Sequence, residues 1–403
     1  MSKNYSDIFT AKAYARANII GGHTDYNQGL VLSALVAEST TVSVKLTQSN
    51  SNSENGKPLL VVARSNAFGA VISYNLGEEE LSGNWGDYIK GVTKILRKEN
   101  FKLAGMEIKI ESFVPLSSGL CSGVVLMVAL MRALKQAFKL DLSDLTISKL
   151  ILRVQIEFLS MSASIADPMV VSIACDKYDK YKYVTEVISV GDAPDVVDVA
   201  DDEDDDNERA FFIDTKTLEF ERIKLPKEME ILVMNMGRGH SKRGEINICR
   251  RRECEEICAL LKVNSLRDLQ IERIAEYEKF LANKTLFKRA RHLLNENIRV
   301  LKMRQAFLEG DCDLAGNLMY LSHSSLSSDY EASTAQIDSY LELFKKHKDV
   351  YGARLATDSG VASLIVALVR KGQKEKISKE IDANTIVINH NNHNNHINHK
   401  RKI

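Results

Sequence analysis

Alternating hydrophobic and polar residues predict several strands along the chain. The Val- and Thr-rich stretch Leu30–Leu46 alternates in part, and Met106–Glu111 alternates cleanly. A period of two places every second side chain on one face of a sheet, so both stretches are predicted to be strands. Glu230–Met236 is predicted to form another strand, and Ser363–Val369 a buried one.

Three further stretches carry a helical pattern. Ser122–Phe138 is apolar on most faces and contains no proline, which predicts a buried helix. Helices are also predicted at Arg250–Leu261 and at Lys288–Leu308. Because strands and helices come in mixed clusters rather than in regular alternation, the pattern favours an α+β fold.

Length and low-complexity segments suggest how the chain is organised. With 403 residues and 44% hydrophobic content, it is long enough for two domains. We predict an N-terminal domain at 1–209, with an insertion at 177–209, and a C-terminal domain at 210–385. The Asn/His-rich tail at 386–403 is predicted to be disordered, although its regularly spaced histidines also suit metal binding.

Two more segments, 49–57 and the acidic run at 201–206, are poor in core-forming residues. The acidic run is predicted to be a solvated loop, with a cation or a basic partner as the alternative.

Charge balance and cysteine usage narrow the class of protein. Lys plus Arg equal Asp plus Glu at 54 each, so the net charge favours neither nucleic acid nor an anionic membrane. No apolar run has the length of a membrane span, and we expect a cytoplasmic monomer that binds small molecules. The six cysteines are expected to be free thiols. Cys254 and Cys258 share one helix face, which suits a structural role better than two metal ligands.

The densest polar cluster runs from Arg16 to Asn27 and contains two glycines beside His, Asp and Asn. It suits either a capped turn or a turn that presents polar groups to a hydroxylated ligand. Its spelling, A-R-x-N-I-I-G-G-H-T-D-Y-N-x-G, closely resembles the galactokinase signature G-R-x-N-L-I-G-E-H-T-D-Y-N-x-G. The resemblance implies the two-domain GHMP kinase fold, with the active site in the cleft between the domains.

By the same resemblance, Arg16 lies near the transferred phosphoryl group, and His23 and Asp25 hold sugar hydroxyls. Gly22 stands where the family has a sugar-binding glutamate. Glycine cannot replace a charge-assisted hydrogen bond, so either the sugar differs or it is bound less tightly.

A loop of small residues precedes the predicted buried helix. Such a loop can cradle phosphate, because the unpaired N–H groups and the helix dipole favour an anion. It resembles the family's phosphate loop, P-x-G-x-G-L-S-S-S-A-A, with only one serine of the triplet retained. The implied nucleotide-binding residues are Ser117, Ser118, Gly119, Leu120, Cys121 and Ser122, and Ser122 is the implied magnesium ligand.

Two further segments resemble the family. Trp85, in W-G-D-Y-I-K-G-V, corresponds to an aromatic residue near the adenine, although a lone Trp also suits a core position. Asp167, in S-A-S-I-A-D-P-M-V-V-S, corresponds to the catalytic aspartate, although an Asp before proline also suits a turn or cap. With Arg16, Asp167 is the implied catalytic pair.

Motifs in the second half are retained unevenly. The family's sugar-facing tyrosine falls on Asn247 or Ile246, neither of which supplies a phenol. His323 and Asp329 match a family segment and are predicted to brace helices. The last glycine-rich motif keeps only Gly360, and Asp358 beside it would repel phosphate.

Together these features predict an ATP-dependent sugar 1-kinase that uses Mg²⁺ and converts galactose to galactose 1-phosphate. The alternative is a galactokinase-like sensor of sugar and ATP that has lost turnover and acts through a regulatory partner.

Overall fold

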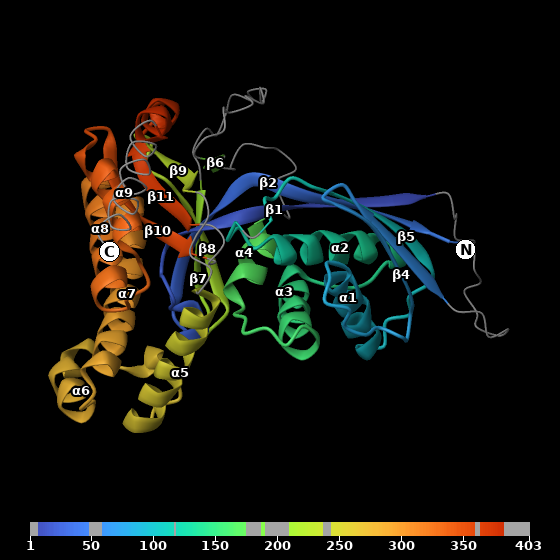
Figure 1. Cartoon of the computed structure of the whole chain (residues 1–403), viewed down its shortest axis with the longest axis horizontal. Coiled ribbons are helices and arrows are strands. Elements are labelled where there is room, and N and C mark those ends of the chain that lie inside the picture. Colours follow the sequence, from blue (N-terminus) through green and yellow to red (C-terminus); the bar gives the residue numbers. More distant parts are fainter. Residues whose placement is uncertain are drawn as a thin grey trace, which may run out of the picture. The chain divides into compact units, whose positions relative to one another are not determined.

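The computed structural model describes residues 7–47, 59–116, 118–174, 187–189, 209–236, 243–358 and 363–382. Packing divides the chain into two compact units, Met1–Arg16 with Leu35–Lys180 and Ala17–Ala34 with Tyr181–Ile403 (Figure 1). Ala17–Ala34 packs with the C-terminal part of the chain, and the predicted boundary at 209 stays a prediction. The predicted segments 49–57, 201–206 and 386–403, and most of 177–209, lie outside the described residues.

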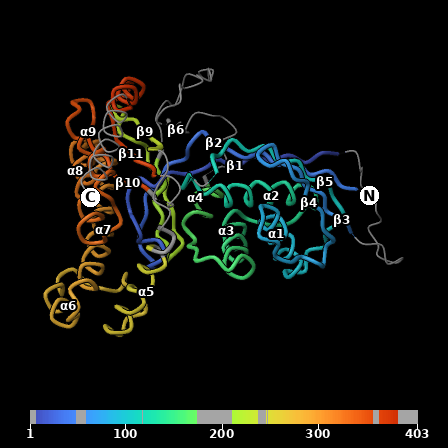
Figure 2. Tube along the Cα trace, in the orientation of Figure 1, coloured from blue at the N-terminus to red at the C-terminus, as the bar shows by residue number. Residues whose placement is uncertain are grey.

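The sheet of the first unit is built from five strands, and its order is β4-β3-β5-β2, with β1 beside β2. Strand β5 pairs antiparallel with β2, with Val42 opposite Ile110, and parallel with β3. Figure 2 traces β1 and β2 running side by side. The strands are β1 (Ile8–Ile20), β2 (Leu30–Leu46), β3 (Leu60–Ser65), β4 (Phe68–Asn75) and β5 (Met106–Ser112).

Helices cover one face of this sheet (Figure 1). They are α1 (Gly86–Lys98), α2 (Ser122–Phe138), α3 (Asp144–Arg153) and α4 (Ala166–Ala174), with a π-helical turn at Val154–Phe158. Helix α2 contacts α1, α3 and α4, which explains why its sequence is apolar on most faces. Val125 and Met127 of α2 are fully buried, as are Val42 and Val44 of the sheet. Burial on this scale stabilises the unit by about 1.5–3 kcal/mol for each large side chain.

The second unit contains two groups of strands. The first five residues of β2 pair with β7 (Arg209–Asp214), which pairs with β8 (Glu219–Lys224). A separate four-stranded sheet has the order β10-β11-β9-β6. Its strands are β10 (Val350–Asp358), β11 (Ser363–Arg370), β9 (Met229–Asn235) and β6 (Val187–Ser189). Strand β11 is buried along almost its whole length, as its apolar sequence predicts.

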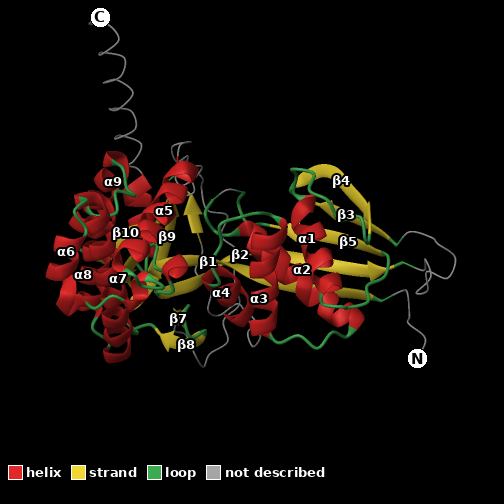
Figure 3. Cartoon of the chain, turned by 90° about the horizontal axis from the view of Figure 1, so that it is seen from below, coloured by secondary structure: helices red, strands yellow, loops and turns green. Residues whose placement is uncertain are grey.

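Among the described residues of the second unit, five α-helices accompany these strands; Figure 3 shows them in red. They are α5 (Arg243–Leu261), α6 (Ile274–Phe280), α7 (Lys284–Glu309), α8 (Cys312–Ser328) and α9 (Ala335–Lys346), with short 3₁₀ turns at Asp25–Asn27, Leu266–Asp268 and Ile271–Arg273. Three of them begin with a side-chain cap, from Asn283, Asp311 and Thr334. Each such cap stabilises the protein by about 1 kcal/mol.

Helix α8 approaches β10 unusually closely at a pair of glycines. A Cβ on Gly316 would lie 2.1 Å from the Tyr351 carbonyl oxygen, and one on Gly352 would lie 2.0 Å from the Gly316 carbonyl oxygen. Real Cβ atoms do not approach backbone this closely, so only glycine allows the helix to rest on the strand.

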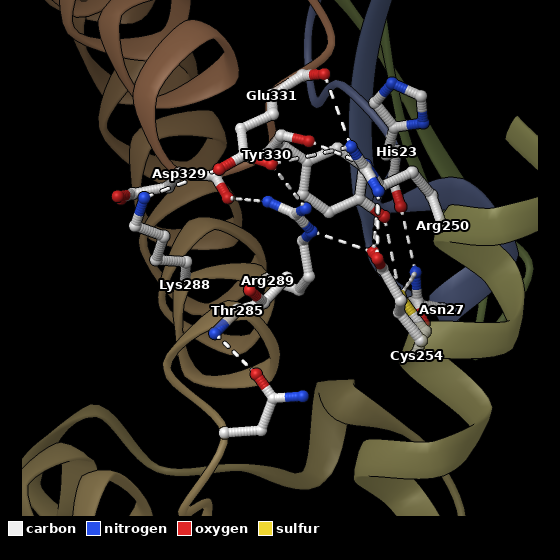
Figure 4. A network of polar contacts seen from close by, with 12 residues as sticks. His23, Asn27, Arg250, Cys254, Thr285, Lys288, Arg289, Asp329, Tyr330 and Glu331 are labelled. Carbon is white, nitrogen blue, oxygen red and sulfur yellow. Dashed lines mark hydrogen bonds and ion pairs between the residues drawn. The ribbon is translucent and has the colours of Figure 1, made fainter. Parts of the chain in front are cut away.

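Buried charges hold the loop that follows α8 (Figure 4). Arg289 donates from Nε to Glu253 at 2.8 Å and from Nη2 to Glu331 at 2.8 Å. Arg250 donates from Nε to the Tyr330 carbonyl oxygen at 2.7 Å. These bonds fix the backbone of Tyr330, whose ring is fully buried.

The predicted elements are confirmed, including Leu30–Leu46 and Ser122–Phe138 at the residues expected. Helix α5 begins seven residues earlier than the predicted Arg250, at Arg243. The mixture of sheets and helices confirms the predicted α+β class. Within the described ranges, no helix is both long and apolar enough to cross a membrane.

The contact between α8 and β10 predicts a sharp cost for Gly316→Ala. The added methyl group meets backbone atoms that cannot rotate away, so we expect the free energy of unfolding to fall by about 1–3 kcal/mol. Urea denaturation measures this loss. Gly69→Ala is the matched control, because a Cβ at Gly69 has open space around it; its effect should stay within about 0.5 kcal/mol. Equal effects of the two substitutions would contradict the close-packing argument.

A pH dependence follows from His292, which is buried beside Tyr330. Burial lowers the pKa of His292 to about 4. The unfolded chain binds a proton at this residue near pH 6.5, whereas the folded chain does not. The contribution of His292 to the free energy of unfolding is therefore fully present above pH 6.5. It decreases as the pH falls toward 4, by up to about 1.4 kcal/mol per pH unit. We expect His292→Gln to flatten the decline between pH 6.5 and 4.5, measured by urea denaturation; an unchanged slope would count against a buried neutral imidazole.

Candidate functional site

The first unit brings together the two residues predicted to be catalytic. Arg16 lies in β1 and donates from Nε to Asp167 Oδ1 at 2.8 Å and from Nη2 to Asp167 Oδ2 at 2.7 Å. Both side chains are largely buried, with 13% and 32% exposed. A bidentate pair of this kind fixes both groups in one geometry, since the planar guanidinium matches the carboxylate. Asp167 is therefore more than a turn residue, because it is held by a residue 151 positions away.

The predicted phosphate loop lies beside this pair. Arg16 also donates from Nη1 to the Gly119 carbonyl oxygen at 3.4 Å. Ser118 is buried and donates from Oγ to the Pro115 carbonyl oxygen at 2.8 Å, so this hydroxyl shapes the loop. Leu120 is fully buried, and Ser122 is the first residue of α2. Ser117 lies outside the described residues.

The N-terminus of α2 has a backbone that suits phosphate binding, but its side chains differ from those of the family's phosphate loop. Cys121 has the left-handed backbone with φ of 53° and is the N-cap of α2. The first N–H groups of a helix have no partner within it, so this end can bind an anion. Burial raises the pKa of the Cys121 thiol to about 12, so it stays neutral and uncharged toward phosphate.

A tyrosine ring explains why Gly123 replaces a serine of the family's loop. A Cβ at Gly123 would lie 2.6 Å from Cε1 of Tyr88. Tyr88 lies in α1, and its ring packs directly on the Gly123 backbone at the start of α2. The loss of one hydroxyl from the loop is therefore coupled to an aromatic ring that takes its place.

Trp85 precedes α1 and stacks on Phe68 of β4, with ring centroids 5.5 Å apart and planes 5° apart. Its indole Nε1 is buried and has no hydrogen-bond partner among the described residues. A buried indole N–H is usually paired. Trp85 thus packs on Phe68 and keeps one unpaired indole donor, and its contact with adenine stays a prediction.

The second unit contains the predicted sugar-binding turn, which follows β1. The Thr24 hydroxyl lies 2.9 Å from the Gly21 carbonyl oxygen and 2.6 Å from that of Leu30. Asn27 donates to the His23 carbonyl oxygen at 3.0 Å. Gly21 has a φ of 99°, and His23 is left-handed with a φ of 64°. A strained, internally bonded turn of this kind presents its side chains in one fixed arrangement.

Aromatic packing holds His23 neutral. The rings of His23 and Tyr330 lie 4.6 Å apart (Figure 4). The Tyr26 hydroxyl lies 3.2 Å from His23 Nδ1. Burial and the nearby His292 lower the pKa of His23 to about 3. A neutral imidazole can both donate and accept a hydrogen bond, which suits a sugar hydroxyl.

A buried carboxylate that no sequence motif indicated anchors the turn. Glu296 of α7 accepts from the amides of Gly21 and Gly22 at 3.0 and 3.1 Å. Burial alone would raise the pKa of Glu296, but Arg299 and Arg354 outweigh it, and the pKa is lowered. Glu296 lies about 270 positions from the turn, so no local pattern could have identified it.

The sequence predicts one protein ligand for magnesium, the hydroxyl of Ser122. No cluster of three His, Cys, Asp or Glu side chains suited to a metal occurs in the described part of the chain. Mg²⁺ is often held by few protein oxygens together with substrate phosphates. Ser122, the first residue of α2, is the predicted protein ligand and offers such an oxygen.

The remaining predicted residues fall on the scaffold or outside the described part. His323 contacts Asp338 at 3.0 Å, and Asp329 pairs with Arg291 at 2.6 Å, so both join helices of the second unit. Ile246 lies within α5. Residues 359–362, with Gly360, lie outside the described ranges, as do the side chains of Asn247 and Asp358. Cys254 is buried 3.4 Å from the Tyr330 hydroxyl.

Comparison with known proteins identifies relatives over most of the chain. The family model for the GHMP kinases N terminal domain matches residues 87–174, and that for the galactokinase galactose-binding signature matches residues 2–46. A galactokinase of Thermotoga maritima is 30% identical over 371 residues, which cover 92% of both chains. The galactokinase of Thermotoga neapolitana is 29% identical, with the same coverage.

Solved structures show the same fold. Lactococcus lactis galactokinase complexed with galactose has a TM-score of 0.77 and 24% identity, and the match covers 95% of this chain and 92% of that one. Methanococcus jannaschii mevalonate kinase has a TM-score of 0.60 and 16% identity, with 94% and 96% covered.

The predicted α+β fold is therefore that of the GHMP kinases. With the galactose-binding signature at its N-terminus and relatives along 92% of its length, the chain belongs to the galactokinase family.

Proposed function

We propose that this chain is an ATP-dependent sugar 1-kinase that transfers the γ-phosphoryl group of Mg-ATP to the anomeric hydroxyl of galactose. The observation that carries the proposal is the bidentate pair of Arg16 and Asp167 beside the phosphate loop. Family membership supports ATP as the phosphoryl donor. The galactose-binding signature over residues 2–46 supports galactose as the acceptor.

Asp167 is the group that acts on the attacking hydroxyl. Its carboxylate is partly exposed, while Arg16 holds both of its oxygens. The hydroxyl donates to Asp167, loses its proton as the oxygen attacks the γ-phosphorus, and ADP leaves with the bridging oxygen. Arg16 stabilises the negative charge on the transferring group. Mg²⁺, bound with ATP, offsets charge on the phosphates.

Each remaining part of the site has a separate role. The amides at the start of α2 bind phosphate oxygens, and Ser122 adds a hydroxyl. The stacked rings of Trp85 and Phe68 contact the adenine, and Trp85 Nε1 gains a partner. In the turn, His23 and Asp25 bind sugar hydroxyls, and the buried Glu296 fixes the backbone just before them, at Gly21 and Gly22.

One observation, the altered phosphate loop, supports the alternative function as a sensor. Cys121 supplies a neutral thiol, and Gly123, beneath Tyr88, supplies no side chain. A protein with this loop that bound Mg-ATP and sugar without turnover would be the predicted sensor. The two functions differ in turnover, since both require binding.

The catalytic pair predicts a large loss of turnover in Asp167→Asn. The amide keeps the shape of the carboxylate but cannot accept the proton, so we expect kcat to fall by about 10²–10⁴-fold. A coupled assay of ADP release with Mg-ATP and galactose measures this effect. The matched control is Asp144→Asn, because Asp144 also pairs with a buried arginine, Arg132, in the same unit.

Asp144→Asn should leave kcat within about twofold, since charged pairs elsewhere affect stability rather than chemistry. Equal losses in both variants would mean that Asp167 is structural. Binding of Mg-ATP and sugar without turnover in the unsubstituted protein would support the sensor instead.

Trp85 offers an independent test of the nucleotide site, because it is the only tryptophan in the chain. If adenine contacts the stacked pair, Mg-ATP titration will change the intrinsic fluorescence and raise the Tm in parallel. At 100 times Kd the stabilisation should be about 2.7 kcal/mol. A rise in Tm without any fluorescence change would place the nucleotide away from Trp85.

A further inference from the structure

A buried arginine takes the place of a side chain at Gly22, within the turn expected to bind the sugar. A Cβ on Gly22 would lie 2.5 Å from Nη2 of Arg354 and 3.8 Å from its Cζ. The guanidinium therefore packs on the glycine in the direction in which a side chain at position 22 would project. Arg354 lies in β10 and is fully buried.

Arg354 is poorly paired for a buried charge. Its Nη1 donates to the Ile19 carbonyl oxygen at 3.3 Å. Within the described ranges, neither Nε nor Nη2 has a hydrogen-bond partner. The nearest carboxylate oxygen reported for it, Glu296 Oε1, lies 4.0 Å from Nη2, beyond hydrogen-bond distance.

Glu296 is already committed to other donors. It accepts from the amides of Gly21 and Gly22, from the Ser322 hydroxyl at 2.6 Å and from Arg299 Nε at 2.7 Å. Arg299 and Arg354 thus share one buried carboxylate, which leaves one positive charge in excess among these three side chains. The pKa values of His23 and His292 are lowered to about 3 and about 4, so neither imidazole adds a further charge at pH 7.

An uncompensated buried guanidinium with two free donors is costly unless a further anion pairs with it. From these contacts we propose that the turn at Gly22 and Arg354 form a subsite for a carboxylate on the sugar, so that the preferred acceptor is a sugar acid. This inference rests on the proposed kinase function and refines its substrate class. Because the guanidinium is planar and rigid, the bond from Nη1 to the Ile19 oxygen also fixes Nε and Nη2, which are the two donors left for the carboxylate.

A substitution at position 22 can neutralise the excess positive charge of Arg354. A glutamate there would pair with Arg354 itself and remove the excess charge, although its Cβ would require the guanidinium to shift and would contact Leu326 Cδ1 at 3.7 Å. Glutamine has the same size without the charge. The pair Gly22→Glu and Gly22→Gln therefore separates charge from steric effects.

Binding and turnover are measured separately on the full chain, with galacturonate, glucuronate and galactose, by calorimetry and by ADP release. We expect the better uronate to bind the unsubstituted protein with a Kd about 10-fold below that of galactose, as a charge-assisted pair predicts. Gly22→Glu should abolish this preference, and Gly22→Gln should retain it. Acetate or sulfate, each added separately at the concentration of the uronate, should not compete with the uronate for binding.

The outcomes distinguish the two proposals. Turnover of galactose without a preference for either uronate overturns the carboxylate subsite and leaves the kinase intact. A uronate preference in binding, without turnover of any sugar, supports the subsite and contradicts the kinase. If no sugar binds, both proposals fail. If sulfate competes as well as a uronate does, the site binds any small anion, which also overturns the inference.

Discussion

The second unit depends on one buried carboxylate. Glu296 accepts hydrogen bonds from two consecutive amides, Gly21 and Gly22, and thereby fixes a turn whose backbone includes the unusual φ of Gly21. A carboxylate is retained without solvent only when its lone pairs are satisfied. Here Ser322 and Arg299 complete the set. Removing the carboxylate would leave two buried amides and a buried arginine without partners at once.

Around this anchor, side chains act on the turn through aromatic packing and charge. Arg250 and Arg289 donate hydrogen bonds to backbone oxygens of the loop after α8. These bonds position the Tyr330 ring, whose centroid lies 4.6 Å from those of both His23 and His292. The histidines are thereby kept neutral in a place where a proton would be costly. The chemistry of the turn therefore depends on helices that contribute no ligand contact of their own.

In the first unit, an ion pair and a backbone site lie beside side chains that differ from the family's motif. Arg16 and Asp167 form the bidentate pair on which the proposed phosphoryl transfer rests, and the start of α2 offers backbone donors. The side chains of the loop have changed around them, with a neutral thiol at Cys121 and the Tyr88 ring against Gly123. Backbone amides do not depend on these identities, so a phosphate site can survive such changes.

The sequence by itself determined most of the elements and the family. Periodicity placed β2, β5 and α2 almost to the residue, because burial on one face or on most faces leaves a direct trace in the pattern. The motifs around Arg16 and Asp167 singled out two residues that the fold brings into contact, since such signatures are local. The tertiary structure alone decided which distant residues support the site. Glu296, Tyr88 and Arg354 reach their partners through folding of segments far apart in the chain, and burial and charge balance exist only after that folding.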